Sequence, residues 1–336
     1  MNNNKLGYKA MRVYTLFVLA LVSLFTACTS NTFEVKIEDE VKVDLLRFED
    51  DLMSLTFLTL QEKLPVLAKK YQKFVPANYE DSLYQMSLMR EVAFPLNQKL
   101  FEDKLTYAPQ HDNMEQDINT VLSHYKYYYP ESNITEAYTF ISGLSRSFDP
   151  VMYDSNSVVI AVDQYYGSDY PVYEQSGVFD YQRQLMTAEF LKVDLARYLA
   201  LSRFKPLKSD ANFLETLIYM GRVNYFVESM NPGISEETKM RFSNEELSYC
   251  KQNEERVWTY LVEKEILYSN DAMLIKKYTE PRPFANSMEK ESPGRIGVWF
   301  GRQIVDEYVK NEKVSLVDLM NEKDLLKIFR KAKYRP

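Results

Sequence analysis

The chain has 336 residues, of which 46% are hydrophobic and 26% are charged. This composition excludes bulk disorder, a collagen-like repeat and a protein with many membrane spans. Lys and Arg number 41 against 48 Asp and Glu, a net charge of -7, which argues against a nucleic-acid-binding protein because such a protein needs a basic surface. Two Cys and two His are too few for a disulfide framework or a site built from several His ligands.

The N-terminus is typical of an exported protein. A basic start precedes an apolar run over residues 13–25 and then small residues, the pattern of a secretory signal peptide. The apolar run is shorter than the about 20 residues that a transmembrane helix needs. We therefore expect residues 1–27 to be a signal peptide. Its basic residues are Lys5, Lys9 and Arg12.

The sequence LFTAC over residues 24–28 resembles the bacterial lipobox, with Phe25 where Leu is usual. We expect Cys28 to be acylated and to begin the mature chain, with residues 28–35 as a short tether. An ordinary signal peptide followed by a coincidental Cys is the alternative. Thr29 is not the Asp that is often linked to inner-membrane retention, which favours the outer membrane, facing the periplasm.

The remaining chain, residues 36–336, is predicted to be one mainly helical domain of the α+β class. Residues 36–130 would form an N-terminal helical layer, and residues 131–336 a small sheet with further helices. Residues 36–51 favour an edge strand or a short helix. Apolar periodicity and the Pro positions predict helices over residues 59–74, 80–93, 94–105, 112–127, 181–204, 210–230, 243–269, 271–279 and 321–332.

Two β-branched and aromatic runs, at residues 138–141 and 157–162, predict two strands that pair in a small antiparallel sheet. The loop that follows, residues 163–173, contains four Tyr. Tyr rings in a loop are either a platform for sugars or peptides or part of the core beneath the loop.

The few Cys and His side chains are interpreted as structural. Cys250 falls on the apolar face of a predicted helix, so we expect an inert core thiol. With Cys28 acylated, Cys250 has no partner for a disulfide. His111 and His124 are interpreted as ordinary residues, because two imidazoles cannot supply a three-ligand metal site.

The segment SPGRIGVWFGRQIVDEY, residues 292–308, holds three of the nine Gly in the chain. Gly297 and Gly301 are four residues apart, which places both on one face of a helix. Gly inside a helix costs about 1 kcal/mol relative to Ala. The pair therefore suggests the close approach of another backbone or of a ligand.

Several segments together resemble one known family. They are RF at residues 47–48, AVDQYYG at 161–167, LIYMG at 217–221, QNEERVW at 252–258, LYS at 267–269, PF at 283–284, PGRIGVWFGRQIV at 293–305 and YRP at 334–336. With the lipobox, they resemble the gliding-motility-associated lipoprotein GldB family of the Bacteroidetes. The resemblance covers essentially the whole mature chain, and the segment around Trp299 is its most specific part.

The family in turn looks like zincin-type peptidases in layout. The residues that would align with His-Glu-x-x-His read VDLAR at residues 193–197, and Met220 precedes Gly221. All three zinc ligands are replaced and only Asp194 is a charged acceptor, so the resemblance implies an inherited fold without activity.

Asp194 and Arg197, three residues apart, suit an ion pair on a helix face. The alternative is that Arg197 points into a residual cleft with Tyr165 and Tyr166 on its rim. The candidate residues of this cleft are Tyr165, Tyr166, Asp194, Arg197, Gly221, Gly297, Trp299, Gly301 and Arg302.

The leading functional hypothesis, implied by the resemblance, is a lipid-anchored envelope protein that is a non-catalytic component or accessory of the gliding and associated secretion machinery. Its partners would be the membrane, through the acyl chains, and envelope proteins; it would need no cofactor. One alternative is a periplasmic lipoprotein that binds a peptide or glycan in a Tyr-lined cleft. The least favoured is a divergent zinc hydrolase in which His111 or His124 approaches Asp194.

Overall fold

A computed structural model describes residues 33–109, 111–145, 149–154, 156–281 and 292–336 of the chain. The chain divides into two units, Met1–Glu34 and Val35–Pro336, and the fold below is that of the second. Cys28, the expected signal peptide and most of the expected tether lie outside the described residues. Within the described ranges, no helix has the length and apolar character needed to cross a membrane.

A four-stranded sheet has the order β1-β2-β4-β3, formed by β1 (Asp44–Arg47), β2 (Glu136–Phe140), β3 (Val151–Asp154) and β4 (Ser157–Ala161). β2 lies parallel to both β1 and β4, and only β3 is antiparallel to its neighbour. The expected antiparallel sheet is therefore wrong, because the sequence analysis missed β3. β3 runs back along the sheet, and β4 then returns in the direction of β2.

Residues 36–51 form both of the elements that the sequence favours. β1 is an edge strand, and helix α2 (Phe48–Met53) follows it directly. Helices α3 (Leu60–Lys70), α4 (Ser82–Ala93) and α5 (Pro95–Tyr107) come next, close to their predicted ranges. The rings of Phe48 and Phe74 stack with centroids 4.3 Å apart, and Tyr71 and Tyr138 pack edge-on around them. This cluster joins the N-terminal helices to the sheet, so the N-terminal region is part of the α+β core.

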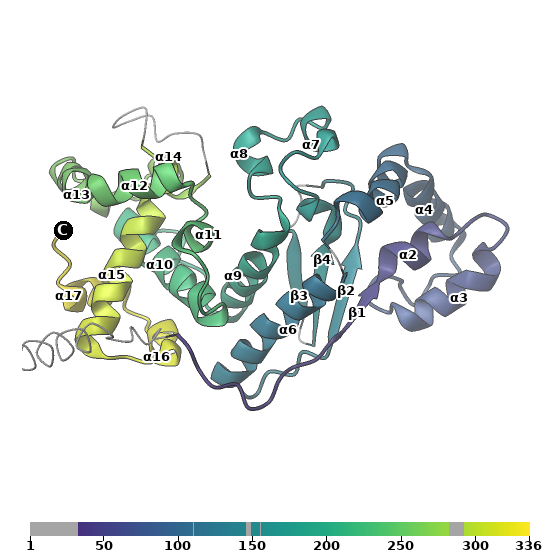
Figure 1. Ribbon diagram of the computed structural model, residues 1–336, viewed down its shortest axis with the longest axis horizontal. Coiled ribbons are helices and arrows are strands. Elements are labelled where there is room, and N and C mark those ends of the chain that lie inside the picture. The colour runs from purple at the N-terminus through teal and green to yellow at the C-terminus, as the bar shows by residue number, and fades with distance from the viewer. Residues whose placement is uncertain (1–32, 110, 146–148, 155, 282–291) are drawn as a thin grey trace, which may run out of the picture. The chain divides into compact units, whose positions relative to one another are not determined.

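Helices α6 (His111–Tyr128) and α9 (Leu191–Arg203) contact each other and the sheet, α6 at β1 and α9 at β3 (Figure 1). The predicted helix over residues 181–204 is broken into α8 (Asp180–Arg183), η2 (Ala188–Phe190) and α9. The Met186 carbonyl accepts a hydrogen bond of 2.9 Å from the Gly167 amide, and Thr187 is extended. The helix cannot continue through this point. Two short helices precede α8, η1 (Val162–Tyr165) and α7 (Pro171–Gln175).

The rest of the chain is helical. The predicted helix over residues 243–269 is broken at Asn253, whose side-chain amide donates a 2.8 Å hydrogen bond to the Tyr249 carbonyl and ends the first part. The elements are α10 (Phe213–Met230), α11 (Glu236–Met240), α12 (Asn244–Gln252), α13 (Glu254–Glu263), η3 (Ile266–Tyr268), α14 (Ala272–Thr279), α15 (Ile296–Glu312), α16 (Leu316–Asn321) and α17 (Leu325–Ala332).

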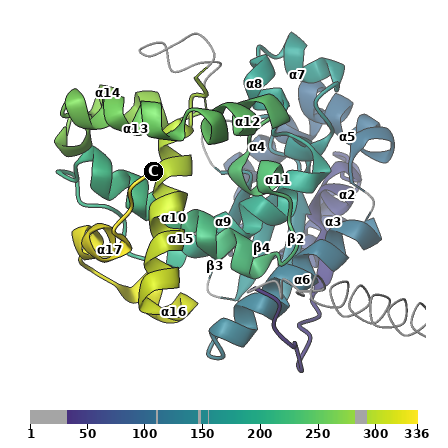
Figure 2. The same cartoon turned by 60° about the vertical axis from the view of Figure 1, so that its left-hand side comes forward.

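Helices α10 and α15 make the most extensive contact between any two described elements and lie together in both views (Figures 1 and 2). A Cβ on Gly221 would come closer than 3.0 Å to the carbonyl of Gly301, and a Cβ on Gly301 would meet the carbonyl of Leu217 as closely. A Cβ on Gly297 would lie 2.7 Å from the carbonyl of Tyr278, before α15. The close backbone approach expected for Gly297 and Gly301 is confirmed.

Replacing Gly301 by Ala should destabilise the protein by at least about 2 kcal/mol, because the added methyl group meets backbone atoms that cannot rotate away, and this outweighs the about 1 kcal/mol gained in helix propensity. Urea unfolding of the purified protein measures the difference. Lys310→Ala, at an exposed position of the same helix, is the matched control and should change stability by less than about 0.5 kcal/mol. Equal effects of the two substitutions would contradict the close crossing.

Candidate functional site

Helix α9 carries the positions that the sequence analysis aligned with a zincin motif. Val193, Leu195 and Ala196 are buried on its apolar side. Asp194 accepts a hydrogen bond of 3.0 Å from the Tyr165 hydroxyl and forms an ion pair with Arg241, the residue that ends α11. The expected Asp194–Arg197 pair is not among the contacts of the described residues, because Tyr165 and Arg241 occupy the Asp194 oxygens.

The Tyr-rich loop belongs to the core. Tyr165, Tyr166, Tyr170 and Tyr173 are each at most 3% exposed. The hydroxyl of Tyr166 donates to the Leu100 carbonyl at 2.9 Å, that of Tyr170 to Asp103 and that of Tyr173 to the Asp163 carbonyl. Buried phenols need such partners. The expectation that Tyr165 and Tyr166 form the rim of a cleft is therefore wrong, and the core-packing alternative is confirmed.

The candidate residues on α10 and α15 are also structural. Gly221, Gly297 and Gly301 serve the helix crossing, and Trp299 is 2% exposed. The Arg302 guanidinium, 4% exposed, pairs with Asp306 at 2.8 Å, with Glu228, and with the Asn224 side-chain oxygen at 3.1 Å. The placement of these five residues in a binding cleft is wrong, because helix packing and ion pairs already occupy them.

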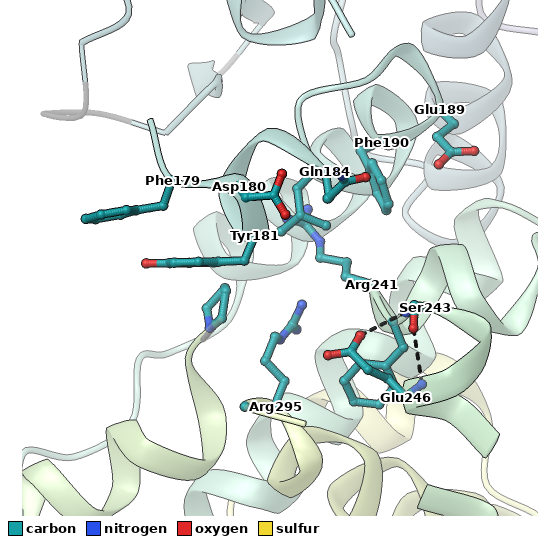
Figure 3. A pocket seen from close by; sticks show the side chains of 14 residues that line it. Phe179, Asp180, Tyr181, Gln184, Glu189, Phe190, Arg241, Ser243, Glu246 and Arg295 are labelled. Carbon is teal, nitrogen blue, oxygen red and sulfur yellow. Dashed lines mark hydrogen bonds between the residues drawn. The ribbon is translucent and has the colours of Figure 1, made fainter. Parts of the chain in front are cut away.

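A cavity of about 710 Å³ lies in this part of the structure, but none of the candidate cleft residues lines it. Two arginines, Arg241 and Arg295, point into it and toward one another (Figure 3). Its walls come from α8, η2, the start of α12 and the N-terminus of α15. Four aromatic rings line it, those of Phe179, Tyr181, Phe190 and Phe242, with the acidic side chains of Asp180, Glu189 and Glu246.

Arg295 stands directly before α15 and is 8% exposed. Its Nε is buried, and within the described residues it has no hydrogen-bond partner. Burial, together with the nearby guanidinium groups of Arg241 and Arg197, lowers the pKa of Arg295 well below its ordinary value. Burial likewise lowers the pKa of Arg197 and Arg241, against the attraction of Asp149. We call Arg197, Arg241 and Arg295 the arginine cluster.

Of the arginine cluster, the sequence analysis identified only Arg197. A signal for Arg295 was present, because an Arg immediately before a long helix opposes the positive end of the helix dipole and so needs a separate reason to be there. Arg241 gave no such signal. It meets Asp194 from 47 residues away and has a left-handed backbone conformation, with φ 58°, which sequence periodicity does not reveal.

The donor chemistry does not favour the zinc-hydrolase alternative. Among the residues that the structure describes, no three His, Cys, Asp or Glu side chains gather as a metal site would require. The Nδ1 of His124 lies 2.9 Å from the Thr120 carbonyl of its own helix, and the side chain of His111 lies outside the description. Cys250 is 1% exposed, and burial raises the pKa of its thiol, as expected for an inert core residue.

Comparison with known families gives one match. A family model described as "Gliding motility protein GldB" matches residues 30–336. The comparisons with curated proteins and with solved structures found no match. The resemblance to zincin peptidases therefore has no support from a solved structure.

Replacing Asp194 by Ala should destabilise the protein by about 3 kcal/mol or more, because it leaves the largely buried Arg241 without its counter-charge. Adding Arg241→Met should recover most of the loss, since the uncompensated charge is then gone. Urea unfolding measures all three proteins. Asp180→Ala is the control, because the Asp180 side chain is 73% exposed in its pair with Arg183 and should change stability by less than about 0.5 kcal/mol. If the double variant is no more stable than Asp194→Ala, the account of this pair fails.

Proposed function

Because the chain belongs to the GldB family of gliding motility proteins, matched over residues 30–336, we propose that it is a non-catalytic component of the gliding machinery, held in the envelope by lipid. Family membership makes the chain a gliding-motility lipoprotein of the cell envelope. The match over nearly the whole mature chain is the observation that carries the proposal.

The absence of catalysis is proposed from the side chains of α9. Val193 and Arg197 occupy the positions where a zincin would carry His ligands, and neither side chain binds zinc. The carboxylate of Asp194 already accepts from Tyr165 and pairs with Arg241, so it is not available as a base toward water. These contacts favour a structural role for Asp194.

Anchoring through Cys28 fits the charge of the chain. Residues 1–27 hold three basic and no acidic residues, so the chain from Cys28 onward has 38 Lys and Arg against 48 Asp and Glu. An acidic protein is repelled by anionic lipid surfaces. We therefore propose attachment through acyl chains, with Thr29 after Cys28 favouring the outer membrane and a periplasmic location.

Protein contacts are the proposed mode of action, with the motility apparatus and its associated secretion system as partners. A Tyr-lined binding cleft is not retained in this proposal, because Tyr165 and Tyr166 are buried in the core.

Crosslinking in cells tests the proposal. The natively lipidated protein should recover the same few envelope proteins at near-stoichiometric yield, and Cys28→Ala, which cannot be acylated, should lose them. Cys250→Ala removes a buried thiol but keeps the anchor, so it is the matched control and should recover the same proteins. If the lipidated protein enriches nothing, the proposal of an assembly component fails. Stoichiometric zinc in protein purified from cells would contradict the non-catalytic role.

A further inference from the structure

Arg295 is a buried cation whose Nε has no partner among the described residues. Among the described residues, Arg241 has an ion pair with Asp194, whereas the buried Nε of Arg295 has no hydrogen-bond partner. Arg295 is more than nine-tenths buried and points into the cavity (Figure 3). Buried Arg is normally paired, so the Arg295 guanidinium is a donor set without an acceptor.

The position of Arg295 makes the need for an acceptor stronger. Helix α15 has 17 residues, and Gly294 and Arg295, directly before its N-terminus, line the cavity at the positive end of the helix dipole. The helix end and the arginine cluster thus add charge of the same sign. An oxyanion in the cavity would accept from Arg295 and would be attracted by the positive end of the helix dipole.

The acidic groups nearby favour an anion of low charge. Asp180, Glu189 and Glu246 line the cavity, Asp194 pairs with Arg241, and Asp149 acts electrostatically on Arg197 and Arg241. A phosphate dianion would be repelled by these carboxylates more strongly than a carboxylate ion, which carries a single charge. The fork of a guanidinium group also matches a carboxylate through two parallel hydrogen bonds.

The rest of the cavity suits an apolar group beside the anion. The rings of Phe179 and Tyr181 stack with centroids 5.8 Å apart, and Phe179 is 60% exposed. Phe190 and Phe242 line the cavity as well. Its volume of about 710 Å³ is in the range of sites that hold a small molecule or a few peptide residues.

We propose that this cavity binds the C-terminal carboxylate of a polypeptide whose last residue is apolar, with Arg295 as the carboxylate donor and the aromatic rings around the last side chain. The inference rests on the proposed function, because it names the chemistry of a partner for an assembly component. Arg241 is a positioning residue, because its guanidinium group already forms an ion pair with Asp194.

Calorimetric titration of the mature lipidated protein in detergent tests the site with defined probes. The peptide acetyl-Gly-Gly-Phe with a free carboxylate should bind at least tenfold more tightly than the same peptide with a C-terminal amide. Equal binding, or no binding of either peptide, would overturn the proposal. Tighter binding of inorganic phosphate, or equal binding of an amidated peptide with an internal Glu, would overturn the assignment to a C-terminus.

The variant Arg295→Met should lose at least tenfold in affinity for the free-acid peptide. It should also melt at the same temperature as the unsubstituted protein or higher, because the substitution removes a buried, unpaired charge; a merely structural arginine would lower the melting temperature. Arg295→Lys, which keeps the charge but not the guanidinium fork, should weaken binding in the same direction and decides the question if Arg295→Met does not fold. Arg330→Gln, at an exposed position of α17, is the control and should bind normally.

Unchanged binding in the folded Arg295→Met protein, or in Arg295→Lys if Arg295→Met does not fold, would overturn the site. That result would leave the recovery of envelope partners through Cys28 untouched, so the two proposals fail separately.

Discussion

The contact between α10 and α15 is the constraint on which the C-terminal half depends. Gly221 and Gly301 leave no room for a side chain between the two backbones, and this fixes both the distance and the register of the helices. Arg302, next to Gly301, is thereby brought to Asn224 and Glu228 of α10. The N-terminus of the same helix carries Arg295 into the cavity. The position of the candidate site therefore follows from a packing contact some distance along the helix.

Two buried arginines, Arg302 in helix α15 and Arg295 directly before it, have opposite electrostatic surroundings. Burial lowers the pKa of Arg302, but the carboxylates of Asp306 and Glu228 outweigh burial and raise it above the ordinary value. For Arg295, burial and the neighbouring arginines act in the same direction, and its pKa falls. Both side chains are at most 8% exposed, so burial alone does not distinguish them. The distinction is the counter-charge that Asp306 and Glu228 supply to Arg302, so the cavity beside Arg295, rather than the Arg302 network, is the place to expect a ligand.

Local patterns in the sequence predicted local structure well. The helices α3 to α6, α10 and α14 fall close to their predicted ranges, because apolar periodicity and Pro positions act within one segment, and the spacing of Gly297 and Gly301 indicated close packing correctly. The failures depend on distant contacts. The hydrogen bond from the Gly167 amide to the Met186 carbonyl breaks the helix predicted over residues 181–204. The unpredicted strand β3 makes β2 and β4 pair in parallel rather than antiparallel. The Asp194–Arg241 pair spans 47 residues, so no pattern within one helix predicts it.

The charged groups of the cavity do not suit a metal ion, whether or not the fold descends from a peptidase. A metal site needs converging carboxylates or neutral imidazoles, whereas this cavity gathers guanidinium groups beside the end of a helix dipole. An Arg at position 197 repels a metal cation. The carboxylate of Asp194 is not available as a metal ligand, because it forms an ion pair with Arg241. The proposed ligand is therefore a carboxylate bound by Arg295, whose buried Nε has no hydrogen-bond partner among the described residues.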